Sequence, residues 1–179
     1  MTADLLDLYA RASEWTAAKV AGAASNLDAP TPCDGWDVHT LLNHMLQTQR
    51  YFSGSARGED VGPPIGEPPE LIGDDPVAAF ERARTDVLRT YGADGVIEKT
   101  GPALGIAFSD ALLHGWDVAR ATAQDATMPA GLAESAYNIV YGRFTPVQRP
   151  GVFKPEIAVS ADASPQEKLL AYTGRSPST

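Results

Sequence analysis

The sequence predicts an all-α fold: a four-helix bundle with a long crossover loop between its second and third helices and an irregular C-terminal wrap. Three observations support this prediction. Four long stretches place apolar residues at helical spacing, strand-forming runs are scarce, and the longest segment without periodicity is rich in proline. With 179 residues, the chain is long enough to bury a sizeable core as a single domain spanning residues 1–179.

Capping and helix-breaking residues define the first two predicted helices. Thr2 is the predicted cap of the first helix, which we expect to run to about Asn26. The segment 28–36 then contains two prolines and a glycine, which end the helix. Asp37 is the predicted cap of the second helix, which we expect to run to about Phe52.

A long loop separates the second predicted helix from the third. Residues 54–73 hold four prolines and show no hydrophobic periodicity. A loop of this length is unusual in a small domain, and it indicates a crossover over a helix bundle. Asp74 or Asp75 then caps the third helix, with Pro76 in its first turn, and the apolar pattern continues to about Tyr91.

The C-terminal half begins with the fourth long helix, predicted over residues 102–124 after a glycine-containing turn. A shorter helix is expected over residues 129–144, and a last short helix begins at Pro165. Residues 145–164 are rich in proline and are expected to be extended. Four apolar side chains in this segment are expected to pack over the bundle: Val152, Phe153, Ile157 and Val159.

Charge and cysteine content exclude several classes of function. The formal net charge is −9 and the isoelectric point is about 4.7, which argues against nucleic acid or an anionic membrane as the main partner. No run approaches the ~20 apolar residues of a membrane span, and the N-terminus does not resemble a signal peptide. One cysteine, Cys33, allows no intramolecular disulfide. We therefore expect a cytoplasmic protein.

The fourth predicted helix places three ionisable side chains on its apolar face. Asp110, His114 and Asp117 stand at positions i, i+4 and i+7. Charged groups on a core-facing stripe are costly unless they are paired, hydrogen-bonded or bound to a metal. An aspartate four residues before a histidine suits a metal, because both side chains can converge on one ion. The alternative is a core histidine paired with one aspartate.

The second helix supplies a further candidate ligand. His44 lies at the flank of its apolar face, whereas His39 is rotated towards solvent. His44, Asp110 and His114 would give two nitrogens and one oxygen, which leaves a position open as in catalytic zinc sites. Ferrous iron uses a similar ligand set. Asp117 is better placed to orient an imidazole than to bind the ion directly.

Four other polar or aromatic residues each allow a functional and a structural interpretation. Arg84 falls in the middle of the apolar stripe of the third helix, so it is a candidate to bind an anionic substrate or cofactor, although such arginines often extend to the rim of a core. Cys33 is a candidate ligand or nucleophile, but packing as a small apolar residue is the favoured interpretation. Trp36 and Trp116 are predicted to be structural, with one of them a candidate wall of the cleft.

Two segments taken together resemble a known family. TPCDGWDVHTLLNHM (residues 31–45) and DALLHGWDVARAT (residues 110–122) are similar to the DinB-like metal-binding superfamily, with its DinB/YfiT-like bundle. Within this superfamily, they look more like an actinobacterial branch related to the N-terminal metal-binding domain of mycothiol-dependent maleylpyruvate isomerase. The ending ADASPQEKLLAYTGRSP resembles stand-alone members of this group, and the likeness covers nearly the whole chain.

The resemblance implies a four-helix bundle with two parallel central helices. It also implies one divalent metal, usually zinc with nickel or iron as alternatives, held here by His44, Asp110 and His114. The isomerase has a glutamate where this chain has Asp110. It also has a second domain that contributes to its active site. We therefore do not expect maleylpyruvate isomerase activity itself from a chain that ends at Thr179.

Two classes of function remain open. In the first, the metal activates a low-molecular-weight thiol such as mycothiol, or a water, for a transferase- or isomerase-like reaction with an electrophile. In the second, the chain is a non-catalytic metal-binding or stress-linked structural module. The expected partners are a small-molecule thiol and an electrophile, and a homodimer is a hypothesis for the assembly. An enzyme should place a cavity with a basic group over the metal, whereas a structural module should close the fourth position.

Overall fold

The structure is a computed structural model that describes residues 4–177, and within them the secondary structure is helical with no strand. The elements are α1 (Leu5–Ala23), α2 (Val38–Arg57), α3 (Pro76–Tyr91), α4 (Val96–Thr100), α5 (Ala103–Ala121), α6 (Leu132–Val140), the 3₁₀ turn η1 (Arg149–Gly151) and α7 (Pro165–Tyr172). The predicted all-α class is therefore confirmed. The extent of the domain, residues 1–179, stays a prediction.

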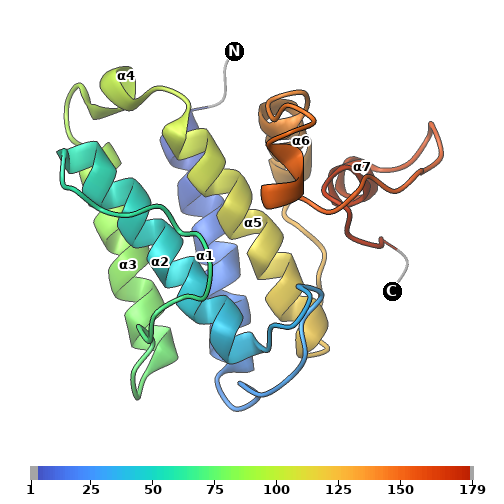
Figure 1. Cartoon of the computed structure of the whole chain (residues 1–179), viewed down its shortest axis with the longest axis horizontal. Coiled ribbons are helices and arrows are strands. Elements are labelled where there is room, and N and C mark those ends of the chain that lie inside the picture. Colours follow the sequence, from blue (N-terminus) through green and yellow to red (C-terminus); the bar gives the residue numbers. More distant parts are fainter. Residues whose placement is uncertain (1–3, 178–179) are drawn as a thin grey trace.

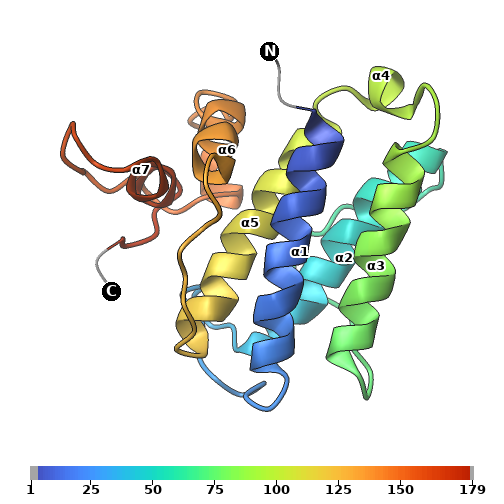
Figure 2. The same cartoon turned by 180° about the vertical axis from the view of Figure 1, so that it is seen from behind.

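Four long helices form the bundle (Figures 1 and 2). Each packs against two neighbours, in the cyclic order α1, α5, α2, α3, and the α1–α5 contact is the most extensive. Figure 1 shows α1 and α5 running in one direction and α2 and α3 in the other. The parallel α2–α3 pair is the reason for the long crossover, because the chain must return along the bundle between Gly58 and Asp75 before α3 begins.

Aspartate side chains cap three of the four bundle helices. Asp4 accepts a hydrogen bond from the backbone N–H of Leu6, and Asp37 and Asp75 cap α2 and α3 in the same way. Each cap satisfies an N–H group that has no partner within its helix. The other cap predicted from the sequence, Thr2, lies outside the described residues.

Several predicted boundaries were wrong by a few residues. The second helix continues past Phe52 to Arg57 and ends at Gly58, which adopts φ +79°. Gly54 lies within the helix, and the loop that follows the helix folds back so that Glu59 and Val61 lie against this glycine. The short helix α4 was missed, because its five residues lie between turns that contain Gly95 and Gly101.

The C-terminal part packs beside the bundle and not across its whole face. Figures 1 and 2 show α6 and α7 on the side of α5, and α6 contacts both α5 and α7. The predicted packing was correct for Phe153, which joins the main apolar cluster. It was wrong for Val152, Ile157 and Val159, whose side chains are exposed.

Two close contacts hold α1 against α5 near the candidate site. The buried Thr16 hydroxyl donates to the backbone carbonyl of Ala111 at 2.9 Å. Gly115 lies so close to α1 that an added Cβ atom would stand 2.3 Å from Thr16 Oγ1.

Among residues 4–177, no helix combines the length and apolar character needed to cross a lipid bilayer.

Candidate metal centre

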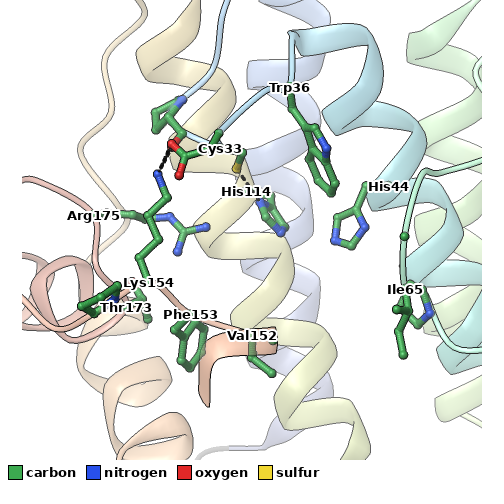
Figure 3. A pocket seen from close by; sticks show the side chains of 16 residues that line it. Cys33, Trp36, His44, Ile65, His114, Val152, Phe153, Lys154, Thr173 and Arg175 are labelled. Carbon is green, nitrogen blue, oxygen red and sulfur yellow. Dashed lines mark hydrogen bonds and ion pairs between the residues drawn. The ribbon is translucent and has the colours of Figure 1, made fainter. Parts of the chain in front are cut away.

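His44 lies in α2, two turns after the Asp37 cap, and points towards α5 (Figure 3). Its ring packs against Trp36, with centroids 5.0 Å apart, and edge-on against His114 at 5.1 Å. Only 13% of the side chain is exposed, and Nδ1 has no hydrogen-bond partner among the described residues. Burial lowers the pKa of His44, despite an opposing effect of Asp110. The imidazole is therefore neutral at physiological pH, which is the form that binds a metal.

Asp110 and His114 face His44 from successive turns of α5. Asp110 Oδ1 lies 4.0 Å from His44 Nε2 and 3.5 Å from His114 Nε2. The candidate ligand atoms of the three side chains all lie within 4.8 Å of one another. The structure thus brings together the three ligands proposed from the sequence. It places His39 elsewhere, where Nε2 lies 3.0 Å from Glu70 Oε2.

Asp117 holds His114 from the side opposite this cluster. The Asp117 side chain is fully buried, and its Oδ2 atom lies 2.9 Å from His114 Nδ1. Because a carboxylate can only accept, Nδ1 must carry the proton. Nε2 then faces Asp110 and is the nitrogen available to an ion. This is the carboxylate–histidine arrangement that orients metal-binding imidazoles.

The charges around His114 shift two pKa values in opposite directions. Burial alone would lower the pKa of His114, but Asp110 and the hydrogen bond to Asp117 outweigh it and raise the pKa to about 10. Burial alone would raise the pKa of Asp117, but Arg175 and His114 hold it well below its usual range. In the metal-free protein, His114 is therefore a buried imidazolium between two carboxylates, and a metal must displace its Nε2 proton.

Two further side chains contact the site: Cys33, for which the sequence favoured a packing role over a ligand role, and Arg175, which was not predicted. Cys33 Sγ donates to Asp117 Oδ2 at 3.5 Å and lies 4.0 Å from His114 Nδ1. Cys33, His114 and Asp117 also form a compact group of possible ligand atoms. Arg175 already donates to both oxygens of that Asp117 carboxylate, at 2.9 and 2.7 Å. A cation in this second group would therefore face a guanidinium, so the first group is the better candidate.

A cavity of about 590 Å³ opens beside the two histidines (Figure 3). Its walls come from three irregular segments: the loop before α2, the crossover loop and the C-terminal segment. Apolar side chains of Ile65, Val152 and Phe153 line one part of it. The basic side chain of Lys154 lines another part and donates to Asp34 Oδ1 at 2.6 Å and to the Pro32 carbonyl at 2.9 Å.

Arg84, the residue proposed from the sequence to bind a cofactor, is not among the residues that line this cavity. Its guanidinium pairs with Glu81 at 3.0 Å and donates to the Ser13 hydroxyl at 3.4 Å. The basic residues that do line the cavity are Lys154 and Arg175. Helical periodicity drew attention to Arg84, but no comparable pattern marks these two residues in their irregular segments.

Comparison with known proteins places the chain in a family. Residues 9–128, more than half of the chain, match the family described as the mycothiol maleylpyruvate isomerase N-terminal domain. The chain belongs to this family. Two uncharacterised proteins from two strains of Mycobacterium tuberculosis are each 28% identical over 187 aligned positions, covering 96% of this chain and 98% of the relative. No solved structure matches the chain at a significant level.

The side chains present fit the divalent metal that this family binds. Two imidazoles and one carboxylate are the donor types of catalytic zinc sites and of ferrous facial triads. The His44 ring is neutral, and its Nδ1 atom has no hydrogen-bond partner among the described residues. Asp117 fixes the proton on Nδ1 of His114. Only 24% of the Asp110 side chain is exposed, so its carboxylate gains from a cation partner. The chain therefore carries a group of residues able to hold a metal ion at the wall of a cavity.

Proposed function

We propose that the protein is a zinc-dependent enzyme that uses mycothiol, or a closely related low-molecular-weight thiol, in a transferase- or isomerase-like reaction with an electrophile. The observation that supports this most is the position of the ligand group: His44 and His114 line a cavity of about 590 Å³ instead of being sealed within the bundle. A cavity of that size is within the range of small-molecule sites. The choice of mycothiol rests on the family description.

Each residue has a distinct part in this proposal. His44, Asp110 and His114 hold the ion, and Asp117 fixes the His114 ring. The ion supplies one chemical effect, which is to lower the pKa of a thiol or water so that a nucleophile is available near neutral pH. In an addition, the thiol sulfur bonds to the electrophilic carbon and the thiol proton ends on the adjacent atom, so no oxidant is required.

The cavity walls provide substrate binding in this proposal. Val152 and Phe153 offer an apolar surface, and Lys154 is the basic side chain with the greater exposure of the two in the wall. Lys154 would bind an anionic group by exchanging its contact with Asp34, whose side chain is largely solvent-exposed. The non-catalytic alternative requires neither the cavity nor a basic wall, and for this reason we favour the enzyme.

Binding of a thiol to the cobalt-substituted protein tests the proposal directly. Titration with mycothiol should produce a sulfur-to-cobalt charge-transfer band. Calorimetry should show that the zinc-loaded protein binds mycothiol with the same affinity as the cobalt-substituted protein. His44→Ala is the control, because it removes a ligand and should abolish both signals. If mycothiol and simple thiols leave the cobalt spectrum unchanged at millimolar concentration, thiol activation is refuted, and a non-catalytic or water-activating role replaces it.

The proposal also covers the cellular location and the oligomeric state of the protein. We infer a cytoplasmic protein, because Cys33 is the sole cysteine of the sequence and a low-molecular-weight thiol is an intracellular partner. The homodimer remains a hypothesis, and analytical ultracentrifugation of the metal-loaded protein tests it. A sedimentation coefficient equal to that of an 18.9 kDa monomer at micromolar concentration would contradict it.

A further inference from the structure

Asp117 is the point at which the C-terminal segment meets the candidate metal centre. Its buried carboxylate accepts from Arg175 Nε at Oδ1 (2.9 Å), and from Arg175 Nη2 (2.7 Å) and His114 Nδ1 (2.9 Å) at Oδ2. Cys33 Sγ donates to Oδ2 as well. The Asp117 side chain has no solvent exposure, and that of Arg175 has 12%. Because a two-point guanidinium contact fixes the plane of a carboxylate, Arg175 determines which oxygen faces His114.

The backbone after α7 aims Arg175 at this carboxylate. The Gly174 N–H donates to the Ala171 carbonyl and the Arg175 N–H to the Leu170 carbonyl, which closes the end of the helix. Gly174 adopts φ +78°, and a Cβ atom there would lie 2.4 Å from Lys154 Cβ and 2.8 Å from the Pro155 carbonyl oxygen. The chain therefore turns at a position where only glycine fits, and the turn delivers the Arg175 side chain into the protein (Figure 3).

We propose that Arg175 is a positioning residue for the metal centre, acting on His114 through Asp117. Without Arg175, the buried Asp117 carboxylate would keep only the donors of His114 and Cys33. A buried carboxylate that has lost its cation partner relaxes by rotating, by gaining water or by taking up a proton. Each of these responses moves the His114 ring or its Nδ1 proton. The inference rests on the proposed metal-binding role of His114. It extends the site from Asp117 to Arg175, which lies 58 residues further along the chain.

The same contact links the cavity wall to the metal ligands. Arg175 lines the cavity together with Thr173, so the short segment that follows α7 forms part of the wall and also supports His114 through Asp117. Residues 9–128 match the family, whereas this segment lies beyond the matched range. The support for His114 is therefore supplied partly by residues that the family match does not cover.

Metal affinity and the cobalt spectrum test this role. Arg175→Ala should weaken cobalt and zinc binding by roughly 10- to 100-fold, the usual effect of losing support for a metal-binding imidazole, and should shift the visible cobalt bands. Arg175→Lys keeps the charge but loses the two-point contact, so its affinity should fall between those of the alanine variant and the parent protein. In an Asp117→Asn background, Arg175→Ala should cause no further loss, because the two residues act through one path.

Arg149→Ala is the matched control for loosening of the C-terminal segment. Arg149 donates to the Tyr172 carbonyl and lies over the rings of Tyr172 and Phe153, but it makes no contact with Asp117. Its loss should leave metal affinity within about twofold and the cobalt spectrum unchanged. Equal effects of Arg149→Ala and Arg175→Ala would overturn the proposal, as would an Arg175→Lys variant with parental affinity and spectrum.

A metal-independent measurement separates this proposal from the proposed function. The proton between His114 Nδ1 and Asp117 should give a protected downfield resonance in the NMR spectrum of the metal-free protein, which Arg149→Ala retains and Arg175→Lys shifts. If the parent protein binds no metal, the proposed function fails, and this resonance alone decides the role of Arg175. An unchanged resonance in Arg175→Lys would then refute the positioning role.

Discussion

Replacing Gly115 with alanine should destabilise the protein strongly, although alanine is the better helix former. The new Cβ atom would lie 2.3 Å from Thr16 Oγ1 and 2.8 Å from Trp15 Cζ3. Thr16 cannot turn aside without losing its 2.9 Å hydrogen bond to the Ala111 carbonyl. The contact is thus between a helix backbone and a buried side chain whose hydrogen bond depends on its present orientation.

The expected loss of stability follows from two destabilising effects and one stabilising effect. Overpacking costs about 1–3 kcal/mol, and loss of the buried Thr16 hydrogen bond costs about 1–3 kcal/mol. Higher helix propensity recovers about 1 kcal/mol. The net loss in the free energy of unfolding is therefore about 3 kcal/mol, which lowers the Tm of a protein of this size by roughly 6–12 °C.

Urea unfolding at equilibrium, followed by circular dichroism, is the assay, and Gly105→Ala on the same helix is the control. A Cβ atom at Gly105 would lie 3.3 Å from the Ile139 Cγ2 atom and 3.6 Å from Leu5 Cδ2, both at the ends of movable side chains. That variant should be neutral or stabilised by up to about 1 kcal/mol. If Gly115→Ala is as stable as Gly105→Ala, then α1 and α5 do not approach as closely as described and the reasoning is refuted.

Three further predictions concern the metal centre. Protein purified without chelators should contain about one metal ion per chain, and His44→Ala and His114→Ala should each reduce this content to none. His39→Ala should retain the ion. Elemental analysis measures the metal content, and loss of metal from His39→Ala would contradict the ligand assignment. Cys33→Ala should keep full metal content, because Arg175 already occupies the Asp117 carboxylate beside it; a metal-free Cys33→Ala protein would favour the second ligand group. Zinc affinity should rise between pH 7 and pH 9 by up to about tenfold per pH unit. The reason is that the pKa of His114 is raised to about 10, so the ion must displace the Nε2 proton of this side chain. Chelator competition measures the affinity, and an affinity that stays constant over this pH range would contradict the prediction.

Helical periodicity accounts for the part of the site that could be predicted. Asp110 and His114 are four residues apart in one helix, and His44 lies on the inward flank of another, so the bundle alone brings them within 4.8 Å of one another. The distinction between His44 and His39 also follows from rotation about the helix axis. These inferences needed no knowledge of how irregular segments fold.

The irregular segments supplied what the sequence could not. Cys33 and Arg175 reach Asp117 across 84 and 58 residues of chain, and no periodic pattern connects them. Arg84 shows the limit of a helical stripe: its side chain is largely buried, as its place in the stripe predicted, but Glu81 and Ser13 bind its guanidinium and it does not line the cavity. Side chains on loops are fixed by tertiary contacts, and these contacts leave little trace in local sequence.

The parallel packing of α1 and α5 has a consequence for the kinetics of folding. These helices share the largest helix–helix contact, yet residues 24–102 separate them in the chain. Forming that contact requires closure of a long loop before the buried surface repays the lost entropy, so we expect slower folding than in an up-and-down bundle with short turns. The order of addition during refolding then matters. Zinc added before α5 has docked against α1 and α2 would meet His114 and Asp110 on an unsupported helix, with His44 of α2 still distant, and would not be retained.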